Sequence, residues 1–114
     1  MKLPRSARIR LRREFLGVQG RGRRLHAGEV LVLAGEATAG RARIGITVSS
    51  KVANAVGRNR VKRWIREAFR ELQGELPAVD LVVIARAGAT AMGLEGARRA
   101  LRAAAAARRD GRAG

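Results

Sequence analysis

The residues of this chain best suited to chemistry are cations gathered between positions 51 and 66. Arg58 and Arg60 bracket Asn59, and the other cations of the stretch are Lys51, Lys62, Arg63 and Arg66. A guanidinium donates two parallel hydrogen bonds to a phosphate, and an asparagine amide both donates to and accepts from a sugar or base edge. The pattern therefore favours phosphate recognition over bond cleavage. By itself it also fits a solvated helix face with an ordinary basic start.

The charge of the whole chain favours a polyanionic partner. Lys and Arg number 25 against 9 Asp and Glu, which gives a formal net charge of +16 over 114 residues. Self-repulsion at this density opposes the compact state, and a polyanion would relieve it. Nucleic acid is the leading candidate. A membrane partner is not expected, because neither end of the chain carries an amphipathic basic helix with aromatic residues.

Side chains for catalysis by the protein itself are scarce. The chain has no Cys, and His26 is its single His, so a zinc site built from His and Cys cannot form within one chain. The acids are scattered, and we expect Glu67 and Glu71 to pair with Arg63 and Arg70 rather than to hold metal ions. We therefore expect no catalytic residue and no metal ligand in the protein. His26 is expected at the surface or on a strand edge.

Length and segment composition predict one domain. The domain should span residues 1–114, with a core at about 8–107 and a flexible basic tail at 108–114. The first residues are basic but lack the apolar run of a signal peptide, and no stretch reaches the length of a membrane span. A cytoplasmic location is the expectation.

A long helix should position the cations. At about 100° per residue, one arc of residues 52–72 is apolar and should face a core. This arc consists of Val61, Trp64, Ile65, Ala68, Phe69 and Leu72. Unpaired N–H groups in the first turn attract anions, an effect that Arg58 and Arg60 strengthen. Neither side chain is needed for the core, so we expect their replacement to leave folding little changed.

Strands should flank this helix. Residues 43–49 alternate, with Ile44, Ile46 and Val48 on one face, and residues 30–34 and 81–85 are apolar runs. Residues 21–26 fit a basic connector or a short edge strand, and a last helix should begin near residue 93. A strand, a helix and a second strand suggest a crossover whose usual hand is right.

Two features could hold an extended nucleic-acid strand. The polar face of residues 43–49 presents Arg43, Gly45, Thr47 and Ser49, although by itself this pattern is better explained by plain solvent exposure. A short helix near residues 12–18 carries Phe15, which fits either the core or a stacking surface for a base.

With these residues in view, the chain resembles the bacterial ribonuclease P protein component. The resemblance rests on RIGITVSSKVANAVGRNRVKRWIREAFREL, on DLVVIARAGA and on REFLGVQGRGRR, and it covers about residues 8–102. It implies a single α+β domain in αβββαβα order, with a four-stranded sheet packed with helices. The crossover would be left-handed, as in the second domain of a small-subunit ribosomal protein.

The resemblance also implies partners and two binding surfaces. The partners would be the catalytic RNA of ribonuclease P and precursor tRNA, with one protein per RNA. The RNA, with Mg²⁺ bound mainly to it, would remove the 5′ leader. Residues expected to contact the catalytic RNA are Lys51, Asn54, Arg58, Asn59, Arg60, Lys62, Arg63 and Arg66. Residues expected in a cleft for the single-stranded leader are Phe15, Arg43, Thr47 and Ser49.

The chain departs from the family in its aromatic content. Gln19 and Leu33 stand where family members often carry aromatic residues, and aromatics make up 3% of the chain. Leader binding would then depend more on Arg and on backbone contacts, with a stronger salt dependence. Two alternatives stay open from composition alone, a free-standing or ribosomal RNA-binding protein and a metal nuclease that acts by itself.

Overall fold

The computed structural model describes residues 23–36, 42–76 and 78–109. Their elements, in chain order, are β1 (Arg23–Ala27), β2 (Val30–Glu36), β3 (Arg43–Thr47), α2 (Ala55–Leu72), β4 (Val79–Ala85), the short 3-10 helix η2 (Ala89–Ala91) and α3 (Gly93–Arg109). The helix expected near residues 12–18, with Phe15, lies outside the described residues. α3 includes residues 108 and 109, which were expected in the tail, and residues 110–114 lie outside the described residues.

The four strands form one mixed sheet in the order β1-β2-β4-β3. β1 pairs with β2 and β2 with β4 in antiparallel fashion, whereas β3 pairs with β4 in parallel. β4 is paired along both of its edges, by β2 on one side and by β3 on the other. The expected central position of this strand is confirmed.

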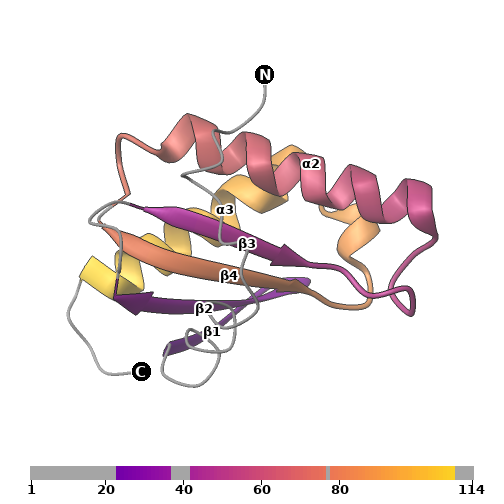
Figure 1. Cartoon of the computed structure of the whole chain (residues 1–114), viewed down its shortest axis with the longest axis horizontal. Coiled ribbons are helices and arrows are strands. Elements are labelled where there is room, and N and C mark those ends of the chain that lie inside the picture. The colour runs from indigo at the N-terminus through magenta and orange to yellow at the C-terminus, as the bar shows by residue number, and fades with distance from the viewer. Residues whose placement is uncertain (1–22, 37–41, 77, 110–114) are drawn as a thin grey trace.

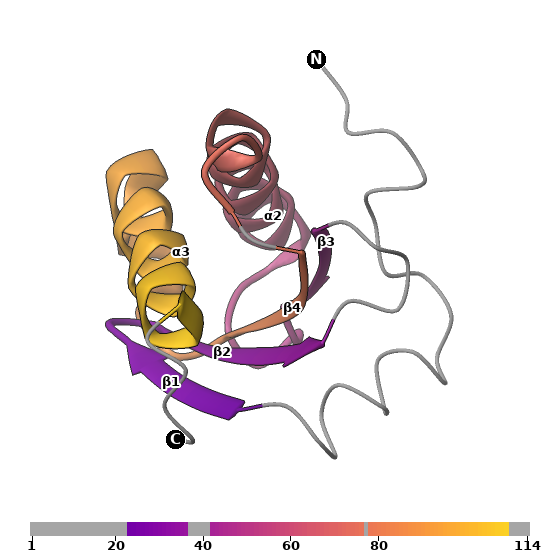
Figure 2. The ribbon, with the colours of Figure 1, turned by 90° about the vertical axis from the view of Figure 1, so that its left-hand side faces the viewer.

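The parallel connection from β3 through α2 to β4 is left-handed. In Figure 1, β3 and β4 run in the same direction and α2 returns above them. In Figure 2, which looks along these strands, the path from β3 over α2 to β4 turns anticlockwise as it recedes. The right-handed crossover expected from general strand statistics is therefore wrong, and the hand implied by the resemblance is confirmed.

Both helices cover the same face of the sheet (Figure 2). Their apolar stripes meet the inward side chains of the strands in one core, to which α2 contributes Val61, Ile65, Ala68, Phe69 and Leu72. α3 adds Ala97, Leu101 and Ala104, and Trp64 packs against the core while partly exposed. The period of 3.6 residues read from the sequence thus identified the buried face of α2.

A partly exposed ion pair joins α2 and α3. Arg98 on α3 donates from Nε and Nη2 to the two carboxylate oxygens of Glu71 on α2, at 2.7 and 3.0 Å, and also contacts Glu95. The hydrogen bond from Arg98 lowers the pKa of Glu71 below its ordinary value of 4.5. The expected pairing of Glu71 within its own helix is therefore wrong, whereas Glu67 does lie 3.9 Å from Arg70.

This ion pair predicts a small acid-dependent loss of stability. Because the pKa of Glu71 is lowered by folding, its contribution is present above pH 4.5 and is lost as the pH falls through the lowered value. Unfolding by urea should show Glu71→Gln to be slightly destabilised at pH 7 and nearly equal to the wild type near pH 2. A difference that persists undiminished at pH 2 would show that the pair is not the cause.

Candidate nucleic-acid interface

The first turn of α2 is held by an asparagine cap. Asn54 lies before the helix in extended backbone, and its Oδ1 accepts a hydrogen bond of 2.8 Å from the backbone N–H of Gly57. A Cβ at position 57 would lie 2.9 Å from the Cβ of Ala53, so the cap needs glycine there. Asn54 was expected to contact RNA. The structure gives its Oδ1 a capping role, which leaves the amide NH₂ for any ligand.

Arg58 also takes part in this turn. Its Nη1 donates to the backbone oxygen of Ala53 at 3.0 Å, and the side chain is partly buried. Arg58 therefore satisfies a carbonyl just before the helix. That its replacement leaves folding little changed stays a prediction. Arg60, two residues further, is exposed. Among the residues that the structure describes, Arg60 has no side-chain partner.

The remaining cations form a face without acidic partners among the described residues, and we call it the α2 cationic face. Its exposed cations are Lys51, Arg60, Arg63 and Arg66, and Lys62 is half-buried. The uncharged Asn59 is exposed among them. Within residues 42–76 and 78–109, these cations make no ion pair, in contrast to Arg43, Arg70 and Arg98. The first turn of α2 also holds no acidic residue. Positive charge from the side chains and from the start of the helix therefore adds at one surface.

The sheet face turned away from the helices differs from the expected polar cleft. Thr47 and Ser49 are exposed as expected, but Arg43 is 8% exposed. Its Nε and Nη2 donate to the two carboxylate oxygens of Asp80 at 3.0 and 2.8 Å. Arg43 and Asp80 are cross-strand partners in the parallel pair, which brings them together. The expectation that Arg43 offers an exposed cation to the leader is wrong in this respect.

An apolar patch lies on this same face. Leu33 and Val82 are buried there, with Leu31 and Ile84 packed against them and partly exposed. The sequence pointed only to the polar side of β3, because the apolar runs of β2 and β4 hide which alternate residues turn away from the helices. Beside the patch, Nη1 of Arg86 lies 2.8 Å from Nδ1 of the exposed His26 on edge strand β1, which confirms the expected position of this histidine.

The described residues hold neither a membrane-spanning helix nor a cluster of metal-ligating side chains. None of their helices combines the length and the apolar character needed to cross a membrane. Within the same ranges, no three His, Asp or Glu side chains gather closely enough to hold a metal ion.

Together, the mixed sheet with its left-handed crossover and the α2 cationic face define a small α+β protein suited to a polyanion. A protein-family model described as Ribonuclease P matches residues 3–108, so the chain belongs to this family and is a protein component of ribonuclease P, an enzyme of tRNA processing.

Relatives and solved structures agree with this membership. The chain is 48% identical over 87 residues to the ribonuclease P protein component of Gluconacetobacter diazotrophicus, covering 74% of this chain and 75% of that protein. Its identity to the component of Brevibacillus brevis is 46% over 94 residues, or 80% and 74% of the two chains.

The structure of the RNase P protein from Thermotoga maritima superposes with a TM-score of 0.75 at 34% identity, covering 86% and 94% of the two chains. The Staphylococcus aureus RNase P protein gives a TM-score of 0.76 at 32% identity, covering 85% and 90%.

Proposed function

We propose that this protein binds the catalytic RNA of ribonuclease P through the α2 cationic face. The observation that carries the proposal is the set of exposed cations along α2 that have no acidic partner in the described part of the chain. Arginine side chains such as Arg60 and Arg63 suit phosphate oxygens because their planar forks donate two hydrogen bonds at once. The backbone N–H groups at the start of α2 add further positive potential at this surface. Asn59 is exposed beside these two arginines.

The second proposed surface holds the single-stranded 5′ leader of precursor tRNA. With Arg43 engaged by Asp80, the described residues that remain for it are Thr47, Ser49 and the partly exposed Leu31 and Ile84. Apolar side chains pack against base faces without reading their sequence, which suits leaders of differing sequence. Phe15, outside the described residues, remains a proposed stacking partner.

The proposal leaves bond cleavage to the RNA. No residue of the protein is assigned a catalytic role, and Mg²⁺ is assigned mainly to the RNA, where it would stabilise charge during phosphodiester hydrolysis. The protein would act in the cytoplasm as one copy per RNA. Its contribution would be electrostatic and positional, since it joins two polyanions that otherwise repel each other.

Omission of single components tests this function. Protein, catalytic RNA and precursor tRNA are mixed at low Mg²⁺, and the release of the 5′ leader is followed with each component left out in turn. We expect cleavage whenever both RNAs are present, and faster cleavage when the protein is added. Cleavage by the protein without catalytic RNA would favour an autonomous nuclease, and no effect of the protein would favour a free-standing RNA-binding protein.

A further inference from the structure

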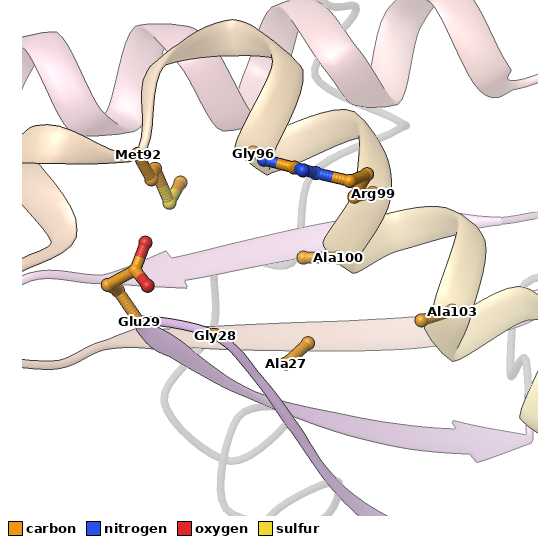
Figure 3. A pocket seen from close by; sticks show the side chains of 8 residues that line it. All are labelled: Ala27, Gly28, Glu29, Met92, Gly96, Arg99, Ala100 and Ala103. Carbon is orange, nitrogen blue, oxygen red and sulfur yellow. The ribbon is translucent and has the colours of Figure 1, made fainter.

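A cavity separate from both proposed RNA surfaces lies between the β1–β2 turn and α3. It is half open to solvent, has a volume of about 280 Å³ and is lined by Ala27, Gly28, Glu29, Met92, Gly96, Arg99, Ala100 and Ala103. Figure 3 shows the carboxylate of Glu29 pointing from the turn toward Met92, and the guanidinium of Arg99 extending along α3 toward Gly96. Its volume is at the lower end of ligand pockets, which span roughly 300–1,000 Å³. It therefore suits one ring system rather than a large cofactor.

Two charged side chains, those of Glu29 and Arg99, border this cavity. Among the residues that the structure describes, neither Glu29 nor Arg99 forms an ion pair or a side-chain hydrogen bond. Elsewhere in the same part of the chain, Asp80 and Glu71 are engaged by arginines. A carboxylate and a guanidinium that face one cavity, and do not pair with each other, can bind a ligand that carries both a hydrogen-bond donor edge and an anion.

The backbone around the cavity holds these groups in place. Gly28 turns the chain at a φ of +60°, and the backbone oxygen of Glu29 accepts a hydrogen bond of 2.9 Å from the N–H of Arg86. A Cβ at Gly88 would lie 3.4 Å from Cγ of Glu29, so the side chain packs against that glycine. On the helix side, a Cβ at Gly96 would lie 2.9 Å from Cβ of Met92, which shows how closely the thioether side chain packs there.

We infer that this cavity binds a single unstacked nucleotide of RNA, with a preference for guanine. The Watson–Crick edge of guanine presents two adjacent N–H donors, which match the two oxygens of the Glu29 carboxylate, an acceptor when ionised. The flanking phosphate would lie on Arg99, and the base would pack beside Met92 and the small side chains of Ala100 and Ala103. Adenine and uracil cannot offer two adjacent donors to the same carboxylate.

This inference rests on the proposed function in one respect: the bound nucleotide would be an unstacked nucleotide of the RNA partner. Free nucleotides therefore test it independently. Amide signals of the ¹⁵N-labelled protein would be followed during titration with guanosine, inosine and adenosine 5′-monophosphates. We expect saturable shifts at Gly28, Glu29 and Gly96, with the affinity falling from guanosine to inosine to adenosine. The preference for guanosine over adenosine should be about tenfold.

Matched variants make the test specific. Glu29→Gln should abolish the guanine preference, and Ala103→Leu should fill the cavity and weaken guanosine monophosphate binding at least about tenfold. Ala106→Leu is the control, because Ala106 is exposed on the same helix and does not line the cavity. Equal affinities for the three nucleotides, or shifts confined to the start of α2, would overturn the inference. Failure of the omission assay with an intact guanine preference would refute only the proposed function.

Discussion

Replacing Asp80 with alanine is expected to destabilise the protein by about 3–5 kcal/mol, because it leaves the buried guanidinium of Arg43 without its carboxylate. The two side chains are 9% and 2% exposed, and two hydrogen bonds of 3.0 and 2.8 Å join them. Domains of this size unfold with roughly 5–15 kcal/mol, so the loss is a large share of the total. Urea unfolding followed by circular dichroism measures it directly.

Two further variants make this result interpretable. Glu67→Ala removes a carboxylate from an exposed pair with Arg70, at 3.9 Å, and should change the free energy of unfolding by less than about 1 kcal/mol. Combining Asp80→Leu with Arg43→Met should recover most of the loss, because an apolar pair replaces a buried ion pair with little penalty. An Asp80→Ala variant as stable as Glu67→Ala would show that Arg43 is solvated and open to ligands, contrary to the structure.

The local features of the fold could be predicted from the sequence. The apolar arc of α2 follows from a period of 3.6 residues and the alternation of β3 from a period of 2, and the structure places Ile65, Phe69 and Ile44 in the core accordingly. α2 also ends at Leu72, the last residue of the range predicted for the helix. These signals act within a few residues, so no knowledge of strand register is needed to interpret them.

Strand register and contacts between distant segments could not be predicted from the sequence. Arg43 and Asp80 are 37 positions apart and meet only because β3 and β4 pair in parallel with these two residues in register. Glu71 likewise finds Arg98 on another helix, 27 positions away. Nothing in the periodicity of one segment specifies such partners. A parallel alignment of the two strands from their first charged residues would have suggested the pairing of Arg43 with Asp80.

For the α2 cationic face, the sequence predicted which side chains are exposed but not which of them build the start of the helix. Exposure of Asn59, Arg60, Arg63 and Arg66 agrees with the sequence pattern, and the pattern could not reveal that Asn54 and Arg58 also build the first turn. This distinction matters for mutagenesis. A variant at position 54 or 58 changes both the helix start and any RNA contact, whereas variants at 60 and 63 change the surface charge alone.

The second large effect is therefore expected from the combined variant Arg60→Gln and Arg63→Gln. We expect it to weaken binding of the ribonuclease P catalytic RNA by at least about 2 kcal/mol, roughly 30-fold, since each charged hydrogen bond contributes ~1.5–3 kcal/mol. Both side chains are exposed and lack partners in the described part of the chain, so the free energy of unfolding should stay unchanged. Filter binding at fixed salt, with urea unfolding alongside, measures both quantities.

A matched control separates a local contact from total charge. Arg24 and Arg102 are also exposed and lie on β1 and α3, outside the α2 cationic face. Arg102 is near Glu71 and Leu72, at the end of α2 opposite to Arg60. Changing both to glutamine removes the same two charges from the chain. If the RNA is bound at the α2 cationic face, this control should lose much less affinity than the variant at positions 60 and 63.

The salt dependence of catalytic-RNA binding tests the central claim most directly. Affinities of the wild type and of both double variants are measured across a series of salt concentrations, and the slopes of log K against log salt are compared. Two lost phosphate contacts should reduce the slope by about 1.4–1.8 in the Arg60 and Arg63 variant, with little change in the control. Equal reductions in both variants would contradict a localised RNA site on α2, because they would show that only the total charge of the protein matters.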